Sequence, residues 1–241
     1  HAIGCERSWL FAHGGDELKE VWWIHFGRYL HERTKGKPTQ YITGKQEFYG
    51  REFRVTPTVL IPRPETEHLI EAALESPAAQ VLDIGTGSGA IAVTLALELH
   101  QRSFACDISE AALQVAARNA NALQASVAFV RSNWGEAFRA GSFDLVISNP
   151  PYVGRSEYDS IPVEVRDHEP EFALWAGEDG LSAYRQLIPD AQRLLKPGGR
   201  LILEIGSTQE EAVGAMLSAW SEVQVRKDLA GHPRVVIARR P

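Results

Sequence analysis

A short apolar run that ends in three closely spaced glycines constrains the fold of this chain more than any other feature. The run Val81-Leu82-Asp83-Ile84 leads directly into Gly85-Thr86-Gly87-Ser88-Gly89, and a helical stretch at 90–99 follows. Consecutive apolar residues are typical of a strand that is buried on both faces. Glycines let the backbone turn tightly and approach a ligand closely, while the helix presents free N–H groups. The pattern therefore predicts a strand, a ligand-binding turn and a helix.

The alternation of strands and helices continues to the end of the chain. Further strands are predicted at 103–107, 126–130, 143–148, 200–205, 223–227 and 234–238, and helices at 109–122, 180–195 and 207–219. The run Lys196-Pro197-Gly198-Gly199 is predicted to separate a helix from the strand after it. Apolar strands that alternate with helices favour a sheet covered on both faces. We therefore predict an α/β fold with a doubly wound, mostly parallel, seven-stranded sheet of the Rossmann-like type.

The chain ahead of this sheet is organised in two other parts. From Leu18 onward, apolar residues at helical spacing predict an amphipathic helix. Phe48 and Phe53 flank Tyr49-Gly50-Arg51, which predicts a β-hairpin, and prolines then punctuate a loop. We predict a helical unit over residues 1–37, a linking hairpin and loop over residues 38–64, and a ligand-binding domain over residues 65–241.

Composition and charge exclude several classes of protein. The chain is 44% hydrophobic and 23% charged, and its formal net charge of −6 argues against a main task of gripping nucleic-acid phosphates. Cys5 and Cys106 lie far apart and belong to no CxxC pair, so we expect neither a disulfide scaffold nor a metal site. No apolar run has the length of a membrane span, and no signal-peptide pattern opens the chain. We expect a cytoplasmic enzyme without membrane contacts.

The residues around the glycine turn suit a ligand that carries a positive charge and a ribose. Their G-x-G-x-G spacing matches neither the dinucleotide fingerprint nor a phosphate-binding Walker loop. Asp83 precedes the glycines and suits a positively charged ligand with an amino group. Asp107 ends the next strand, 22 positions after Gly85, where it can accept hydrogen bonds from ribose hydroxyls. The structural alternative is that the glycines only shape a turn and that Asp107 caps the helix at 109–122.

A second motif, Asn149-Pro150-Pro151-Tyr152, ends the strand at 143–148. Pro150 keeps Asn149 out of the helical region, and neither proline carries an N–H group. The Asn149 side-chain oxygen and a backbone carbonyl form a pair of acceptors for one NH₂ group, and Tyr152 offers a flat face for stacking. This arrangement suits a weak, planar nitrogen nucleophile. The alternative is a plain Asn-Pro turn.

Together these motifs resemble the class I S-adenosylmethionine-dependent methyltransferases. The Asn-Pro-Pro-Tyr signature is shared by DNA adenine methyltransferases and protein glutamine methyltransferases, so the flanking segments decide between them. They resemble the peptide chain release factor glutamine methyltransferase family at 40–44, 46–50, 59–67, 179–181, 195–199 and 228–234. The run Pro62-Arg63-Pro64-Glu65-Thr66-Glu67 beside Asn149-Pro150-Pro151-Tyr152 is the most specific part of this resemblance.

The resemblance implies an activity and a partner. The family transfers a methyl group from S-adenosyl-L-methionine, leaving S-adenosyl-L-homocysteine, to the side-chain amide nitrogen (N5) of the glutamine in the Gly-Gly-Gln motif of class 1 peptide chain release factors, in support of translation termination. The implied partner is a release factor, with no stable nucleic-acid complex, and we expect a monomer. Residues 1–37 then correspond to the remnant of a helical substrate-docking domain, because only about the last two helices of the family's bundle fit before Pro38.

By the same resemblance, individual residues receive roles. The cofactor-binding set is Asp83, Gly85, Thr86, Gly87, Ser88, Gly89, Asp107, Asn133, Trp134 and Asn149. The substrate-binding set is Asn149, Pro150, Pro151, Tyr152, Arg63 and Glu65, and the catalytic set is Asn149, Pro150 and Tyr152. Trp134 is expected near the adenine. Arg63 and Glu65 are either a lid over the pocket or plain loop residues.

Two other functions stay open at this point. One is a DNA or RNA adenine N6-methyltransferase that uses the same Asn149 pocket, against which the acidic net charge and the lack of a target-recognition insertion count. The other is a non-catalytic, cofactor-binding interaction module, which would have no need of paired acceptors at Asn149 and Pro150.

Overall fold

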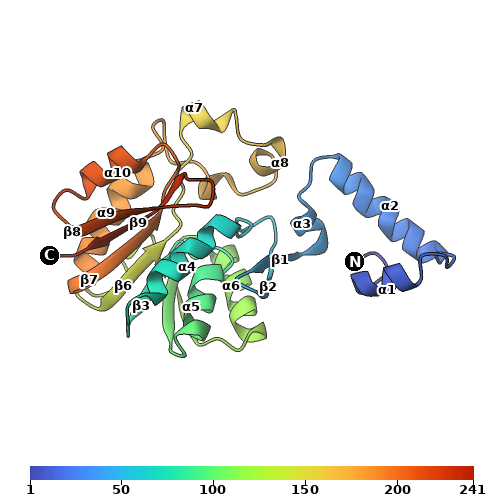
Figure 1. Cartoon of the computed structure of the whole chain (residues 1–241), viewed down its shortest axis with the longest axis horizontal. Coiled ribbons are helices and arrows are strands. Elements are labelled where there is room, and N and C mark those ends of the chain that lie inside the picture. The colour runs from blue at the N-terminus through green and yellow to red at the C-terminus, as the bar shows by residue number, and fades with distance from the viewer.

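A seven-stranded sheet in the order β5-β4-β3-β6-β7-β9-β8 forms the centre of the computed structural model, which describes residues 1–241 and every side chain except that of Arg7 (Figure 1). The strands are β3 (Val81–Ile84), β4 (Ser103–Asp107), β5 (Val127–Arg131), β6 (Phe143–Ser148), β7 (Leu195–Glu204), β8 (Ser221–Lys227) and β9 (Pro233–Arg239). Strands β3 to β7 pair in parallel, and β9 runs antiparallel to both of its neighbours. The predicted doubly wound α/β fold is confirmed.

Helices cover both faces of this sheet, as apolar strands require. One face carries α4 (Glu67–Leu74), α5 (Ala90–Glu98) and α6 (Glu110–Ala122), and the other carries α9 (Ser182–Leu194) and α10 (Glu210–Met216) (Figure 1). Each face has its own buried apolar cluster. Leu82 and Val146 pack toward α9 and α10, whereas their neighbours Val81 and Leu145 pack toward α4 and α5. Because successive side chains pack on opposite faces, each strand is held from both sides. The loops that follow the strands therefore begin at fixed positions.

The strand order sets where a ligand can bind. The chain runs outward from β3 to β4 and β5, and then returns to place β6 on the other side of β3. The loops after β3 and β6 therefore leave the sheet side by side and in opposite directions. In open α/β sheets this switch point, at the carboxyl ends of the strands, is the usual ligand site. Both predicted motifs lie there.

The N-terminal part consists of α1 (Arg7–Ala12), α2 (Glu20–Thr34), α3 (Thr39–Thr43) and the hairpin of β1 (Lys45–Phe48) and β2 (Arg51–Arg54). The predicted hairpin is confirmed, and its Phe48 and Phe53 are buried in the same apolar cluster as residues of α4. By contrast α2 buries none of its residues, and it lies beside the rest of the molecule with α1 (Figure 1). The division into three parts stays a prediction.

Two stretches differ from the sequence prediction. The run Lys196-Pro197-Gly198-Gly199 lies inside β7, which starts directly after α9, so the prediction of a separating break was wrong. The register of β6 on β7 shifts there, because an irregular step lets a strand accommodate a proline that cannot donate a ladder hydrogen bond. Residues 149–179 had no predicted elements, and they contain α7 (Arg155–Tyr158), α8 (Val163–Arg166) and the 3₁₀ turn η2 (Glu171–Ala173). A second 3₁₀ turn, η1 (Pro64–Thr66), precedes α4.

Candidate active site

A cavity of about 380 Å³ lies at the carboxyl ends of β3, β4 and β6, a volume typical of small-molecule sites. Its wall includes the glycine turn 85–88, Asp107, the pair Asn133-Trp134, the segment 148–151, Thr66 and the loop residues 58–60 and Pro62. Among the side chains that the structure describes, Asp107 is the only charged one in this wall. A wall without lysine or arginine is unsuited to a polyphosphate and suits a ligand that is neutral or cationic.

Asp83 supports the glycine turn from below the cavity. Its side chain is fully buried, and Oδ2 accepts hydrogen bonds from the Thr86 hydroxyl at 2.6 Å and from the Ala92 N–H at 3.2 Å. Burial raises the pKa of Asp83 to about 7, and these two hydrogen bonds act in the opposite direction. Within the part of the chain that the structure describes, Oδ1 has no partner. Asp83 Oδ1 is thus a buried acceptor that a bound water molecule can satisfy.

Asp107 joins the glycine turn to the helix that follows β4. Oδ2 accepts the Gly87 N–H and Oδ1 accepts the Ser109 N–H, both at 2.9 Å. Burial raises the pKa of Asp107, while these backbone N–H groups stabilise its charge. A carboxylate offers about four lone-pair sites. Asp107 can thus hold the local backbone and still accept two hydroxyl hydrogen bonds inside the cavity that it lines.

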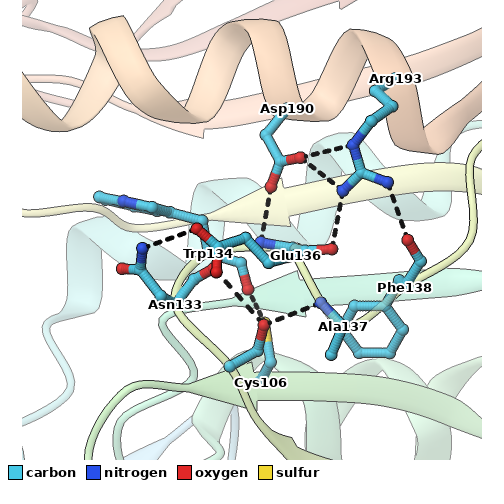
Figure 2. A network of polar contacts seen from close by, with 10 residues as sticks. Cys106, Asn133, Trp134, Glu136, Ala137, Phe138, Asp190 and Arg193 are labelled. Atoms are coloured by element: carbon cyan, nitrogen blue, oxygen red, sulfur yellow. Dashed lines mark hydrogen bonds and ion pairs between the residues drawn. The ribbon is translucent and has the colours of Figure 1, made fainter.

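The Asn133-Trp134 segment lines another side of the cavity. Figure 2 shows the polar contacts of this segment. Trp134 has a left-handed backbone, with φ of +48°, and its carbonyl accepts a hydrogen bond from the Cys106 thiol at 3.2 Å. The indole Nε1–H donates to Gln186 Oε1 on α9 at 3.0 Å. Asn133 donates to Glu136 Oε1 at 2.9 Å. The Gln186 contact orients the Trp134 indole, and the Cys106 contact orients the Trp134 backbone.

Two charged residues of α9 hold the backbone just after Trp134 (Figure 2). The Gly135 N–H donates to Asp190 Oδ2 at 2.6 Å, while Arg193 donates to the carbonyls of Gly135 and Phe138, each at 2.8 Å. A Cβ at position 135 would lie 2.3 Å from Leu194 Cδ1 and 2.7 Å from Asp190 Oδ2. A side chain at position 135 would therefore require Leu194 and Asp190 to shift.

Asn149 directly follows β6, and its side-chain amide is held by a hydrogen bond. Its amide Nδ2–H donates to Thr66 Oγ1 at 3.1 Å, and the Thr66 hydroxyl donates to Glu204 Oε2 at 2.7 Å. The Tyr152 hydroxyl lies 3.5 Å from Glu204 Oε1. Since the amide nitrogen of Asn149 is engaged, its oxygen is the atom left for a ligand in the cavity.

The chain has relatives of known class. Residues 64–163 match the family described as "Methyltransferase small domain", and residues 1–44 match "PrmC N-terminal domain". A release factor glutamine methyltransferase from Koribacter versatilis is 45% identical over 246 residues, which cover 100% of this chain and 88% of the relative. The chain belongs to the release factor glutamine methyltransferase family. It is therefore an enzyme, a methyltransferase, and the family resemblance of its motifs is confirmed.

Two further comparisons agree with this membership. The release factor glutamine methyltransferase of Bacillus subtilis is 44% identical over 249 residues, covering 98% of this chain and 86% of the relative. The solved Thermus thermophilus 16S rRNA N2 G1207 methyltransferase, in complex with AdoMet and guanosine, has a TM-score of 0.60 and 21% identity over 82% of this chain and 50% of that one. At that identity the likeness shows a shared fold.

The methyltransferase cavity brings most of the sequence-predicted residues together. Those in its wall are Gly85, Thr86, Gly87, Ser88, Asp107, Asn133, Trp134, Asn149, Pro150 and Pro151. Asp83, Gly89, Tyr152, Arg63 and Glu65 lie outside the wall. Their ligand-binding roles, like those of the wall residues, stay predictions.

Arg63 is engaged by a buried carboxylate. It forms an ion pair with Glu169, whose other oxygen accepts the Ile61 N–H at 3.1 Å. The pair ties the loop before η1 to the segment before η2. Arg63 thus acts as a brace between two loops that reach the cavity wall at Pro62 and at Phe172.

Three polar residues near the acceptor end of the cavity were missed by sequence reasoning. Thr66 and Glu204 hold Asn149 as described. Gln209 is buried and its Nε2 donates to the carbonyls of Tyr152 at 2.9 Å and Gly180 at 3.0 Å. A lone carboxylate in the apolar run 201–205 was a usable signal for Glu204. Gln209 carried no such signal, because its partners are distant in sequence.

Proposed function

We propose that this enzyme transfers a methyl group from S-adenosyl-L-methionine to the side-chain amide nitrogen N5 of the glutamine in the Gly-Gly-Gln motif of class 1 release factors. The observation that carries the proposal is the free carbonyl oxygen of Asn149, next to the Pro150 carbonyl, in one cavity with the glycine turn. The names of the relatives, release factor glutamine methyltransferase, support the substrate class.

The donor set of the cavity fits the cofactor. Asp107 would accept the ribose hydroxyls and Trp134 would contact the adenine. Asp83 lies behind the wall and would shape the cofactor site through its hydrogen bonds to Thr86 and Ala92. The wall without basic side chains suits a sulfonium cation. When bound, S-adenosyl-L-methionine supplies an electrophilic methyl group. The complex of a protein of this fold with AdoMet supports this assignment.

Positioning accounts for the chemistry that the chain itself has to perform. An amide nitrogen is a poor nucleophile because its lone pair is delocalised into the carbonyl. Asn149 Oδ1 and the Pro150 carbonyl accept both N–H bonds of the substrate NH₂ and so direct the nitrogen toward the donor. The same acceptors stabilise positive charge as it develops on that nitrogen. The methylated nitrogen then loses its proton to water, so no strong general base is required.

The helical unit over residues 1–37 is assigned to release-factor docking. Residues 1–44 match the N-terminal domain of this family, and the α2 side chains Trp23, Ile24 and Phe26 are each at least half exposed. Exposed apolar side chains at this density are typical of protein-binding surfaces.

The decisive experiment incubates the enzyme with S-adenosyl-L-methionine and a class 1 release factor, and maps added methyl groups by peptide mass spectrometry. We expect one methyl on the glutamine of the Gly-Gly-Gln motif and none on a factor whose glutamine is replaced by alanine. Methylation of a DNA or RNA duplex in a parallel reaction, with none on the factor, would instead assign the adenine N6 activity. No turnover with any of these substrates, despite donor binding in calorimetry, would support a binding module.

A further inference from the structure

Glu204 is the one buried carboxylate at the acceptor end of the cavity that the chemistry above leaves unused. It ends β7, is only 2% exposed, and lies among the apolar residues 201–203 and 205. Burying a carboxylate is unfavourable unless its oxygens are hydrogen-bonded. Its strongest side-chain contact is the Thr66 hydroxyl at 2.7 Å, and Thr66 in turn contacts Asn149.

The direction of these hydrogen bonds follows from the chemistry of the groups. An ionised carboxylate can only accept, and a hydroxyl has a single proton to donate. The proton of Thr66 therefore goes to Glu204, and the Thr66 oxygen is left as an acceptor. Only the NH₂ end of the Asn149 amide can meet an acceptor, so its oxygen is turned the other way.

We propose that Glu204 is a positioning residue that acts through Thr66 to set the orientation of the Asn149 amide, so that its oxygen is presented to the NH₂ group of the substrate. This rests on the proposed function, because the acceptor must carry an NH₂ group. Without the relay, the Asn149 amide can rotate by half a turn at little cost. It would then oppose the substrate NH₂ with a second NH₂ group.

The relay makes the orientation depend on the protonation of Glu204. A protonated Glu204 can donate to Thr66, whose own proton is then free to go to the oxygen of Asn149 and reverse the amide. Burial raises the pKa of Glu204 to about 7, and the hydrogen bond from Thr66 and the charge of Arg234 on β9 oppose this rise. Glu65 on η1 acts in the same direction as burial, while the Asn149 amide lowers the pKa and the Tyr152 hydroxyl faces Oε1. The productive form is the ionised one, so activity should rise with pH through about 7.

Variant kinetics test the relay with residues 1–241 as the enzyme and a release factor as methyl acceptor. Thr66→Val removes the hydroxyl at nearly constant shape and should lower kcat about 100-fold, whereas Thr66→Ser should restore most of it. Asp83 at the cofactor end also has a pKa raised to about 7, so kcat is measured with donor saturating at every pH. Glu204→Gln should lower this kcat about 10-fold and abolish the acid-side decline of kcat, because the glutamine side chain does not titrate. Donor affinity by calorimetry should stay within about 3-fold throughout, which separates positioning from cofactor binding.

A control variant shows whether loss of any half-buried carboxylate lowers kcat, and a spectroscopic readout follows Asn149 without turnover. Glu98→Gln removes a half-buried carboxylate that pairs with Arg51 away from the cavity, and should leave kcat and its pH profile unchanged. The Asn149 side-chain NH₂ signals in ¹H–¹⁵N spectra, assigned by their loss in Asn149→Ala, should titrate with a midpoint at about pH 7 and stop titrating in Glu204→Gln.

The proposal is overturned if Glu204→Gln keeps the acid-side decline, if donor affinity falls in parallel with kcat, or if the Asn149 signals do not titrate in the unsubstituted enzyme. Circular dichroism and thermal melting identify a variant that has simply unfolded. Failure of the proposed function is distinguishable, since the unsubstituted enzyme would then leave the release-factor glutamine unmethylated. The Asn149 NH₂ signals would still show whether Glu204 sets the orientation of the Asn149 amide.

Discussion

The two ends of the cavity are built in different ways. At the cofactor end, the decisive contacts are local: Asp83 bonds Thr86 three residues away, and Asp107 bonds Gly87 across 20 residues. At the acceptor end, Asn149 meets Thr66 across 83 residues, and Thr66 meets Glu204 across 138. One end is a short motif that folds around its own strand. The other is assembled only when three distant segments have packed.

This difference has a functional consequence. Substitutions at the acceptor end should change turnover while leaving donor affinity nearly intact, because their contacts do not reach the glycine turn. Substitutions at the cofactor end should do the reverse. Single substitutions at each end therefore test that separation.

Asn149→Ala is expected to have the largest effect. It removes the oxygen that holds the substrate NH₂, and loss of one such transition-state contact lowers kcat by about 100- to 1,000-fold. Donor affinity, measured by calorimetry, should change by less than about 3-fold. The exposed Asn121→Ala on α6 is the matched control. Equal losses of turnover and donor affinity would contradict the separation of the two ends.

Asp107→Asn tests the cofactor end. The substitution removes the charge that strengthens hydrogen bonds to ribose hydroxyls and presents an NH₂ group to one of its present donors. Hydrogen bonds to a charged group contribute about 1.5–3 kcal/mol, so the dissociation constant for S-adenosyl-L-methionine should rise about 10- to 100-fold. At saturating donor, kcat should be close to normal. An unchanged dissociation constant would mean that Asp107 only holds the backbone N–H groups of Gly87 and Ser109.

Gly135→Ala tests whether α9 limits the space behind Trp134. Because the added Cβ would meet Leu194 and Asp190, we expect the free energy of unfolding to fall by about 1–3 kcal/mol. Urea denaturation measures this change. The control is Gly214→Ala in α10, where a Cβ meets nothing within 4 Å and alanine should stabilise the helix by about 0.5–1 kcal/mol. If both variants lost stability alike, steric conflict at position 135 would be refuted.

The same division explains what could be predicted from the sequence. The strand, turn and helix around Gly85 were predictable because apolar runs and glycines act over a few residues. The strands at 103–107 and 143–148 were correct to the residue for the same reason. Thr66, Glu204 and Gln209 were missed, because each acts on a partner that only the tertiary fold brings near. The position of Lys196-Pro197-Gly198-Gly199 inside β7 was mispredicted since pairing with β6 outweighs the local preference for a break.

Trp134 belongs to the cofactor end, yet its placement depends on the distant helix α9. Its indole donates to Gln186 across 52 residues of sequence. Gln186→Leu removes that exposed, neutral hydrogen bond, which contributes about 0.5–1.5 kcal/mol, so donor affinity should fall about 2- to 10-fold with kcat unchanged. Calorimetry measures the change in donor affinity. The exposed Gln114→Leu on α6 is the control. A fall in kcat with unchanged donor affinity would mean that α9 influences the acceptor end. The two ends of the cavity would then not be independent.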